Sequence, residues 1–284
     1  MQILRGSMGV SWTAVKSAKW NGRIRLNGTE AHTDVRVKPG DIVSVEWAED
    51  RPVYPLRPYE IPLTIPYEDE NLLAVDKPAG LASQSSRNHP DDSLENALYA
   101  RSGCPGAFVY RPVNRLDKGT GGLMIIAKDP HSQHLMQKSL HTPDFRRRYL
   151  ALTKGCPTEK EGVLNFPIGK APGATVKREV NPEGKECVTR YRVLRAETWE
   201  SLILLELETG RTHQIRVHLS HIGCPVRGDF LYGTEEPDTF PGCFALHSAG
   251  VVMRHPITGK EIRLTSLPEW AKDIEPSVLL MDFH

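Results

Sequence analysis

Asp117 stands in a short segment whose residue types and spacing could do chemistry. It lies between Arg115 and Lys118, ahead of Gly119 and Gly121. A Gly-rich turn exposes its side chains, and an aspartate flanked by cations is expected to be ionised at neutral pH. Such a carboxylate can act as a base or as a nucleophile. Residue type alone favours the alternative, a turn aspartate that binds its own backbone.

A second segment, GRTHQIRVHLSHIG at 210–223, is too polar for an ordinary core helix. Helical spacing gives it an apolar stripe of Ile215, Leu219 and Ile222, and Arg216 lies beside this stripe. A guanidinium held against apolar side chains needs a charged partner. We expect that partner to be Asp117.

The histidines of this second segment could suggest a metal ion. His213, His218 and His221 are spaced differently from the HExxH pattern of zinc enzymes, and the segment contains no acid. The spacing therefore predicts no metal site.

A third segment, FRRRYLAL at 145–152, runs basic residues into an aromatic residue at the start of a predicted strand. In an RNA enzyme this order would put phosphate-binding charge beside a ring that can stack on an extruded base. The alternative is an exposed basic turn followed by a core tyrosine, and this is the interpretation that the segment favours by itself.

The charge of the 284-residue chain is unevenly distributed. The net charge is only +1, yet 101–150 has nine Lys and Arg against three acids, and 229–284 has four against nine. This asymmetry permits a phosphate-binding face on a nearly neutral molecule, although solvated surface charge would look the same.

Composition favours a water-soluble protein of the cytoplasm. Hydrophobic residues make up 39% and charged residues 25%, and no apolar run approaches the roughly 20 residues that cross a bilayer. The first residues lack the pattern of a secretory signal. The five cysteines form no CxxC pair, so we expect neither a disulfide framework nor a cysteine zinc site, only buried or incidental thiols.

The elements that would position these segments are strands mixed with helices. At the start, 11–20 is predicted to be a helix that Ser11 caps, and 23–27 and 42–47 are predicted strands. Asn27-Gly28 and the sequence KPGD at 38–41 supply the turns between them. A Pro-rich stretch then predicts a linker. The remaining strands are expected at 71–80, which ends in a turn, 122–127 and 201–208, and the helices at 132–140 and 212–221.

Together these segments resemble the RluA-type family of pseudouridine synthases. NRLDKGTGGL at 114–123 is similar to the family's HRLD-x-x-TSG-L signature, and 210–223 is similar to its GRTHQIRVHL-x-x-IG block almost letter for letter. The resemblance spans about residues 65 to 265, with shorter matches at 75–81, 148–151, 225–233 and 246–248. Residues 24–28 and 37–43 resemble an abbreviated S4 RNA-binding module, for which a generic small domain without RNA contacts is the alternative.

This resemblance implies a fold and a division of the chain. The fold is α+β, a mixed, mostly antiparallel β-sheet with flanking helices. The expected parts are an S4-like RNA-binding module at 1–50, a Pro-rich linker at 51–66 and a pseudouridine synthase catalytic domain at 67–284.

The same resemblance implies roles for single residues. Asp117 would be catalytic, Arg216 would pair with it, and Tyr149 would lie against the target base. The expected RNA-binding residues are Arg115, Lys118, Arg146, Arg147, Arg148, Arg211, His213 and Gln214. The departures are Asn114 where the family has His, Gly121-Gly122 where it has Ser-Gly, and Ser85-Ser86 where it often has His-Pro. They affect expectations about the substrate more than about activity.

The implied reaction turns uridine into pseudouridine. One glycosidic bond breaks and a bond from C5 to C1′ forms, without net redox change or an outside group, so no cofactor is expected. Asp117 could attack C1′, abstract a proton to give a glycal or add to C6 of the base, and we favour a role at the sugar. The uridine must leave its stack, which costs a few kcal/mol.

The expected partner is structured RNA, with ribosomal RNA first and transfer RNA second. We expect a monomer with no membrane and no obligate protein partner. The alternative is a catalytically idle RNA-binding or ribosome-assembly factor with the same fold, against which the intact Asp117, Arg216 and Tyr149 speak. A glycosidase would need a second catalytic acid beside Asp117, and neither motif segment contains one.

Overall fold

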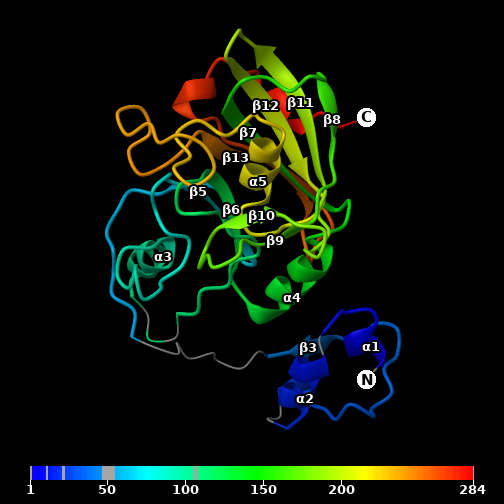
Figure 1. Ribbon diagram of the computed structural model, residues 1–284. Coiled ribbons are helices and arrows are strands. Elements are labelled where there is room, and N and C mark those ends of the chain that lie inside the picture. Colours follow the sequence, from blue (N-terminus) through cyan, green and yellow to red (C-terminus); the bar gives the residue numbers. More distant parts are fainter. Residues whose placement is uncertain are drawn as a thin grey trace.

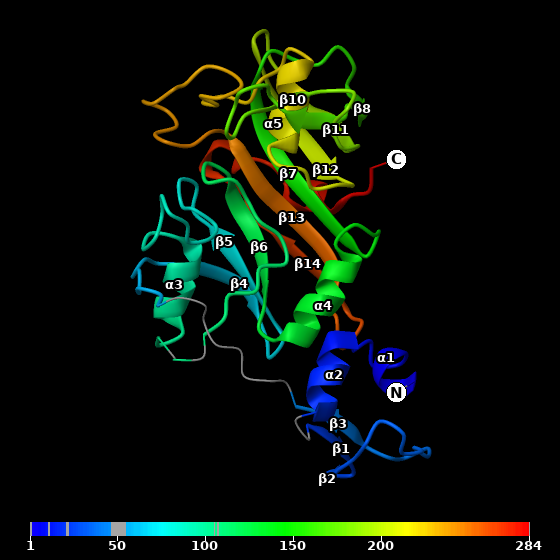
Figure 2. The same cartoon turned by 60° about the horizontal axis from the view of Figure 1, so that its bottom comes forward.

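A computed structural model describes residues 2–10, 12–20, 23–46, 55–104, 106 and 108–283. Figure 1 shows a small N-terminal unit beside a much larger part built on one sheet. The N-terminal unit consists of α1 (Gln2–Arg5), α2 (Trp12–Trp20), β1 (Ile24–Leu26), β2 (Thr29–Glu30) and β3 (Val43–Val45). In Figure 2 this unit lies next to α4 (Pro130–Ser139), and a methyl group built on Gly9 would stand 2.9 Å from Leu135 Cδ2 of that helix.

The N-terminal unit forms for local reasons. Asn27 and Gly28 have φ angles of 51° and 81° and form the predicted turn, a two-residue connection between strands. The turn leads from β1 into β2, a short strand that was not predicted. Asn27 Oδ1 also accepts a hydrogen bond from Ile42 N at 2.9 Å and so holds the chain before β3. The capping residue predicted for α2, Ser11, and the end of the predicted strand at Trp47 lie outside the described residues.

The larger part is a nine-stranded sheet, and the α+β fold class is confirmed. Eight strands follow the order β4-β5-β6-β13-β7-β12-β11-β8, and β14 pairs with β13. Among the described strands of this sheet, each neighbouring pair is antiparallel except β6 and β13. The strands are β4 (Thr64–Glu68), β5 (Leu72–Lys77), β6 (Gly121–Ala127), β7 (Phe145–Lys154), β8 (Glu161–Leu164), β11 (Thr189–Ala196), β12 (Glu200–Leu207), β13 (Leu246–Arg254) and β14 (Glu261–Thr265).

Short helices and one further hairpin complete the fold. The hairpin pairs β9 (Ile168–Lys170) with β10 (Arg178–Val180). The remaining helices are α3 (Leu94–Arg101), α5 (Gln214–His221), and the 3-10 helices η1 (Glu269–Ala271) and η2 (Pro276–Leu280). Among the described helices, none is both long and apolar enough to cross a membrane.

Alternation along β5 and β6 divides the core between the two faces of the sheet. Leu73 and Met124 belong to a cluster with Leu94 of α3, whereas Leu72 and Leu123 belong to a cluster with Met136 of α4. Successive side chains of a strand point to opposite faces, so strands buried on both faces are continuously apolar. The sequences LLAV at 72–75 and GLMIIA at 122–127 have this character.

The Pro-rich segment ends as a strand rather than a linker. β4 begins at Thr64 and pairs with β5, with a register shift between Thr64 and Tyr67. Pro66 lies inside β4, which is tolerated because β4 is an edge strand and because the shift interrupts the ladder there. Positions 51–54 of the predicted linker lie outside the described residues.

Candidate active site

A cleft of about 560 Å³ brings the predicted segments together. Its wall includes 83–86 after β5, 112–117 before β6, Arg147 and Tyr149 of β7, and 210–216 at the start of α5. Four arginines line it, and Asp117 is the one carboxylate among its described lining residues. The cleft can therefore attract an anionic ligand, and it does not offer the paired carboxylates of a glycosidase.

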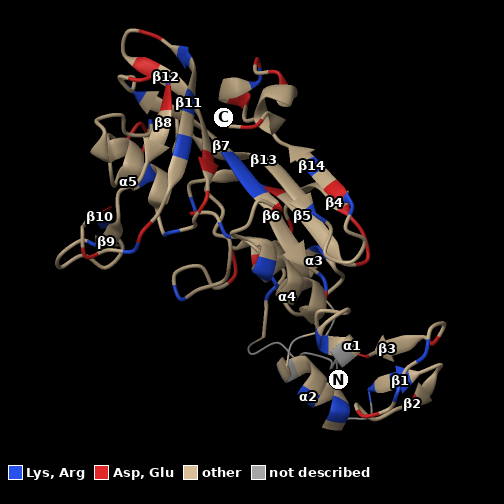
Figure 3. Ribbon diagram, turned by 90° about the vertical axis from the view of Figure 1, so that its right-hand side faces the viewer, with Lys and Arg blue, Asp and Glu red and all other residues tan. Residues whose placement is uncertain are grey.

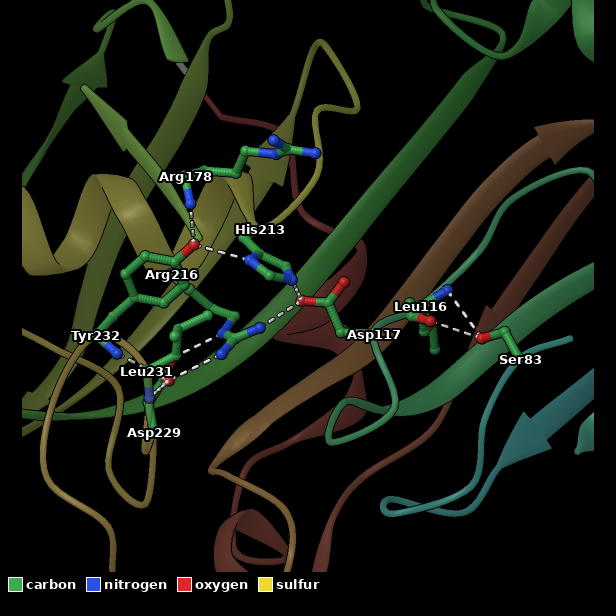
Figure 4. Close-up of polar contacts among 9 residues, drawn as sticks. All are labelled: Ser83, Leu116, Asp117, Arg178, His213, Arg216, Asp229, Leu231 and Tyr232. Atoms are coloured by element: carbon green, nitrogen blue, oxygen red, sulfur yellow. Dashed lines mark hydrogen bonds and ion pairs between the residues drawn. The ribbon is translucent and has the colours of Figure 1, made fainter. Parts of the chain in front are cut away.

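Asp117 and Arg216 meet in this cleft, as predicted. Arg216 Nη1 donates to Asp117 Oδ2 at 2.9 Å, and His213 Nε2 lies 3.8 Å from the same oxygen (Figure 4). No hydrogen bond from a described residue reaches Oδ1, and in Figure 4 this oxygen points away from Arg216. The Asp117 side chain is 28% exposed, so one carboxylate oxygen is held while the other is open to a ligand.

Arg216 is held on three sides. Its Nε and Nη2 donate to the two oxygens of Asp229 at 2.7 and 2.8 Å, and its guanidinium lies over the rings of Tyr232 and Phe244, 4.9 and 4.3 Å from their centroids. Burial opposes the charge of Arg216, but the carboxylates of Asp229 and Asp117 raise its pKa above the ordinary value. Arg216 is thus a fixed cation that presents Nη1 to Asp117.

Asp229 is the important site residue that sequence reasoning missed. It is fully buried and accepts, besides the two bonds from Arg216, hydrogen bonds from the amides of Leu231 and Tyr232 at 3.0 and 3.2 Å. Its place in the family-like block at 225–233 was the available signal. Its burial excludes Asp229 from contact with a ligand, so it positions Arg216.

His213 occupies a special backbone position at the start of α5. Its φ of 59° and ψ of 18° are left-handed, and its ring, through Nδ1, lies 2.7 Å from the hydroxyl of Tyr232. That hydroxyl accepts a hydrogen bond from Arg178 N of β10 at 2.8 Å. Burial lowers the pKa of His213 below its ordinary value. The charge of Arg216 lowers this pKa further, and the charge of Asp117 raises it in part. The imidazole therefore tends to be neutral next to the Asp117–Arg216 pair.

Tyr149 forms part of the cleft wall from β7. Its ring is buried, with 5% of the residue exposed, and burial raises the pKa of its hydroxyl. A neutral aromatic ring in the wall of a polar cleft offers a flat apolar surface to a base.

The loop that carries Asp117 is fixed from several directions. Ser83 Oγ donates to Leu116 O at 2.6 Å (Figure 4), and the backbone amide of Thr120 donates to Asp117 O at 3.0 Å. Lys77, which is buried, donates to the carbonyl of Lys118 and to two carbonyls after β5. Burial lowers the pKa of Lys77 to about 7, against the opposing charge of Asp117.

The departures from the family pattern have structural consequences. Asn114 is buried and binds the backbone of β6, accepting from Ile125 N at 2.8 Å and donating to Leu123 O at 3.4 Å. Gly121 stands where the family has Ser, and a methyl group built on it would stand 3.0 Å from His247 Nδ1. The next residue, Gly122, matches the family's glycine: its φ is 103°, and a methyl group built there would stand 2.3 Å from Ser248 O of β13, so only glycine fits. Neither departure touches the Asp117 carboxylate.

Four of the expected RNA-binding residues are accessible. Arg115 and Arg211 are exposed and line the cleft, and Lys118 is exposed on the Asp117 loop. The half-buried His213 also lines the cleft. Their positions are compatible with RNA contacts, and their roles remain predictions.

The structure corrects the expectation that Arg148 and Gln214 bind RNA. The side chain of Arg148 is 1% exposed and donates to Glu206 at 2.8 Å and to Leu279 O at 2.9 Å. Gln214 is buried. Its Nε2 donates hydrogen bonds to Val188 O and Thr189 Oγ1, and its Oε1 accepts one from Arg211 N. Neither is free to bind RNA, because both already have internal partners.

β7, whose basic residues are blue in Figure 3, also contains Arg146, and its role in RNA binding stays a prediction. Arg146 is half-buried, forms an ion pair with Asp282 and does not line the cleft. The segment is thus a buried strand that begins at Phe145 rather than an exposed basic turn, and of its three arginines Arg147 is the one in the cleft wall.

The three histidines of 210–223 face different surroundings. His213 faces Asp117 and Tyr232, His218 is buried against Thr189, Cys187 and Phe166 O, and His221 lies against the ring of Phe166. In the described part of the chain, no group of three His, Cys, Asp or Glu residues is arranged to hold a metal ion.

Comparisons with known proteins agree with this geometry. The family model described as RNA pseudouridylate synthase matches residues 71–221. The chain is 34% identical over 260 residues to the uncharacterized RNA pseudouridine synthase YjbO of Bacillus subtilis, which covers 91% of both chains.

It is also 34% identical over 266 residues to the ribosomal large subunit pseudouridine synthase D of Xanthomonas campestris, which covers 88% of this chain and 79% of the relative. The solved structure of human RNA pseudouridylate synthase domain containing 1 matches with a TM-score of 0.61 at 23% identity, over 75% of this chain and 86% of that one. At this identity the match is one of fold.

Proposed function

This chain belongs to the RNA pseudouridylate synthase family and isomerises uridine in RNA to pseudouridine, and we propose that Asp117 is the carboxylate that performs the reaction. The observation that carries this proposal is the open oxygen of Asp117, on a carboxylate whose other oxygen Arg216 holds at 2.9 Å. A group aimed in advance at the reacting atoms needs little reorganisation during the reaction.

Asp117 acts at the sugar. The bond between N1 of the base and C1′ of the ribose breaks, the base turns within the cleft, and C5 forms the new bond to C1′. The proton that C5 carried leaves, and N1 gains a proton, so the overall reaction is an isomerisation. An ionised carboxylate beside C1′ can stabilise the positive charge that develops there or bond to it.

The neighbours of Asp117 have distinct tasks. Arg216 keeps the carboxylate charged and oriented, because Asp229 and the rings of Tyr232 and Phe244 fix the guanidinium. Tyr149 supplies the ring against which the extruded uracil lies. Arg115 contacts the RNA near the position that the uridine leaves.

The RNA is ribosomal RNA, with transfer RNA as the second choice. The support is the Xanthomonas relative, which is named as a ribosomal large subunit enzyme. The N-terminal unit adds an S4-like RNA contact, for which it offers the basic residues Arg5, Lys16 and Lys19 beside Trp12 and Trp20, whose exposed fractions are 55% and 75%. The enzyme acts as a monomer, since one chain supplies the whole described cleft. It acts in the cytoplasm, for which the support is again the relative named as a ribosomal large subunit enzyme.

Mapping of pseudouridines tests this proposal. Ribosomal and transfer RNA from cells with and without the gene are compared, and the deletion strain is complemented with the wild type or with Asp117→Ala. We expect a pseudouridine in large-subunit ribosomal RNA that disappears on deletion and returns only with the wild type. Complementation by Asp117→Ala would refute the role of Asp117, and a lost site in transfer RNA alone would refute the choice of ribosomal RNA.

A further inference from the structure

Arg147 is a buried cation in the wall of the active-site cleft. The residue is 5% exposed, and its Nε and Nη2 are buried with no hydrogen-bond partner among the described residues. Arg148, its neighbour in sequence, is also buried but has Glu206 and the Leu279 carbonyl as partners. A buried guanidinium with unused donors is costly, so such a group points to an anion that the free protein lacks.

The surroundings of Arg147 favour an anion and leave room for it. His141 and Arg211 line the same end of the cleft, and the charges of Arg147 and Arg211, after burial, lower the pKa of His141. Gly210 borders the guanidinium, and a methyl group built on it would stand 3.2 Å from Arg147 Nη1. The glycine therefore leaves this side of the guanidinium uncovered.

The position of Arg147 on β7 relates it to the reacting nucleotide. Arg147 and Tyr149 are two residues apart on one strand and both line the cleft, so they share a face of the sheet with their Cα atoms about 6.6 Å apart. If the uracil lies against Tyr149, the ribose-phosphate backbone next to it lies within reach of a long arginine side chain.

We infer that Arg147 binds a phosphodiester of the substrate RNA directly beside the target uridine and so positions the everted nucleotide over Asp117. This inference rests on the proposed function and adds a positioning residue to it. A guanidinium can make two parallel hydrogen bonds to phosphate oxygens, which fixes the backbone in direction as well as in place. The resulting contact orients the nucleotide without reading the base.

The test pairs protein variants with RNA in which a single phosphate is neutral. Once mapping has given the target uridine, RNAs are assembled by ligation with one methylphosphonate linkage either 5′ or 3′ of it. Tritium at C5 of the uridine is released by the reaction and reports kcat/KM. The proteins are the wild type, Arg147→Met, Arg147→Lys and the control Arg192→Met, which removes a half-buried arginine of β11 that pairs with Glu161 outside the cleft.

For the wild type and the control, we expect one of the two neutral linkages to lower kcat/KM by roughly 10- to 100-fold, the value of a hydrogen bond to a charged group. The same linkage should have less than about a 3-fold effect in Arg147→Met, and Arg147→Lys should recover part of the wild-type rate. Equal penalties in the wild type and Arg147→Met at both linkages would overturn the inference and leave the proposed function intact. A wild type without tritium release from any RNA would overturn both.

Thermal unfolding separates this role from a structural one. Because two donors of Arg147 lack a partner among the described residues, Arg147→Met should unfold at the wild-type temperature or above it. A variant that unfolds at a lower temperature and loses the same fraction of activity on every RNA would show that Arg147 supports the fold, which would also overturn the inference.

Discussion

Replacing Asp229 by Asn should disable the enzyme without changing any residue that touches the RNA. Asp229 is buried and binds Arg216 through both oxygens. In the variant Asp229→Asn, the remaining side-chain oxygen can stay on the amides of Leu231 and Tyr232, but the new NH₂ group then faces Nε of Arg216. Two donors would oppose each other at a site where donor and acceptor are now 2.7 Å apart.

The expected effects follow from this geometry. Breaking a buried ion pair by removing one partner costs about 3–5 kcal/mol, which in a protein of this size corresponds to a fall in Tm of roughly 6–20 °C. Arg216 would also lose its orientation toward Asp117, and a displacement of about 1 Å in an active site can cost 100-fold in rate. We therefore expect kcat to fall by about 100-fold with little change in KM.

The assay measures tritium release from RNA that carries tritium at C5 of its uridines and comes from cells that lack the gene. It is run at a temperature below the Tm of the variant. Asp238→Asn is the matched control, since Asp238 is exposed on the same segment and the same charge is removed. The control should keep the wild-type Tm and kcat. An Asp229→Asn protein with wild-type kcat would refute the claim that Asp229 positions Arg216, and one with wild-type Tm would refute the cost assigned to the buried pair.

Three further predictions concern stability and binding. Lys77→Met should lower the free energy of unfolding in urea by at least about 2 kcal/mol, because three carbonyls lose their donor; an unchanged value would contradict the role of Lys77 in fixing the Asp117 loop. Burial lowers the pKa of His247 from 6.5 to about 4, so between these values only the unfolded chain gains the proton, and stability should fall by up to about 3 kcal/mol as the pH drops from 6.5 to 4. His247→Gln should flatten this fall, and an equal fall in both proteins would exclude His247 as its cause. RNA affinity should drop with salt, with a slope of roughly −2 to −3 in a plot of log K against log salt if the three cleft arginines other than Arg216 meet phosphates, and a flat plot would contradict a cationic cleft.

The central contact of the site could be predicted from the sequence because each of its two segments carried its own signal. Asp117 lies between cations before a Gly-rich turn, and Arg216 lies beside an apolar stripe that demanded a charged partner. The two residues are 99 positions apart in sequence. The contact between them was predicted because a buried guanidinium needs a negatively charged partner. The elements predicted from periodicity around them, β5, β6, β12, α4 and α5, lie within three residues of the predicted bounds, whereas α3, β8, β11, β13 and β14 were not predicted.

The rest depended on packing that sequence patterns do not carry. Arg227 precedes Asp229 by two residues, but nothing in the sequence relates Asp229 to Arg216, so their bond required the folded chain. The three arginines of β7 cannot be told apart in sequence, yet they have different surroundings, because successive side chains of a strand point to opposite faces of the sheet. Arg146 and Arg148 lie on the face that the C-terminal segment covers, and Arg147 lies on the face of the cleft. Likewise, β4 could not be distinguished from a linker because its proline is tolerated only at the edge of a sheet.

The most direct measurement is the single-turnover rate of tritium release by Asp117→Asn on RNA that the wild type modifies, with thermal unfolding as the check that the variant is folded. If the open carboxylate oxygen held by Arg216 performs the reaction, the folded variant should bind the RNA with an affinity near that of the wild type and release no tritium above background. Release within about tenfold of the wild-type rate, or about 1.4 kcal/mol in the barrier, would show that the reaction proceeds without this carboxylate.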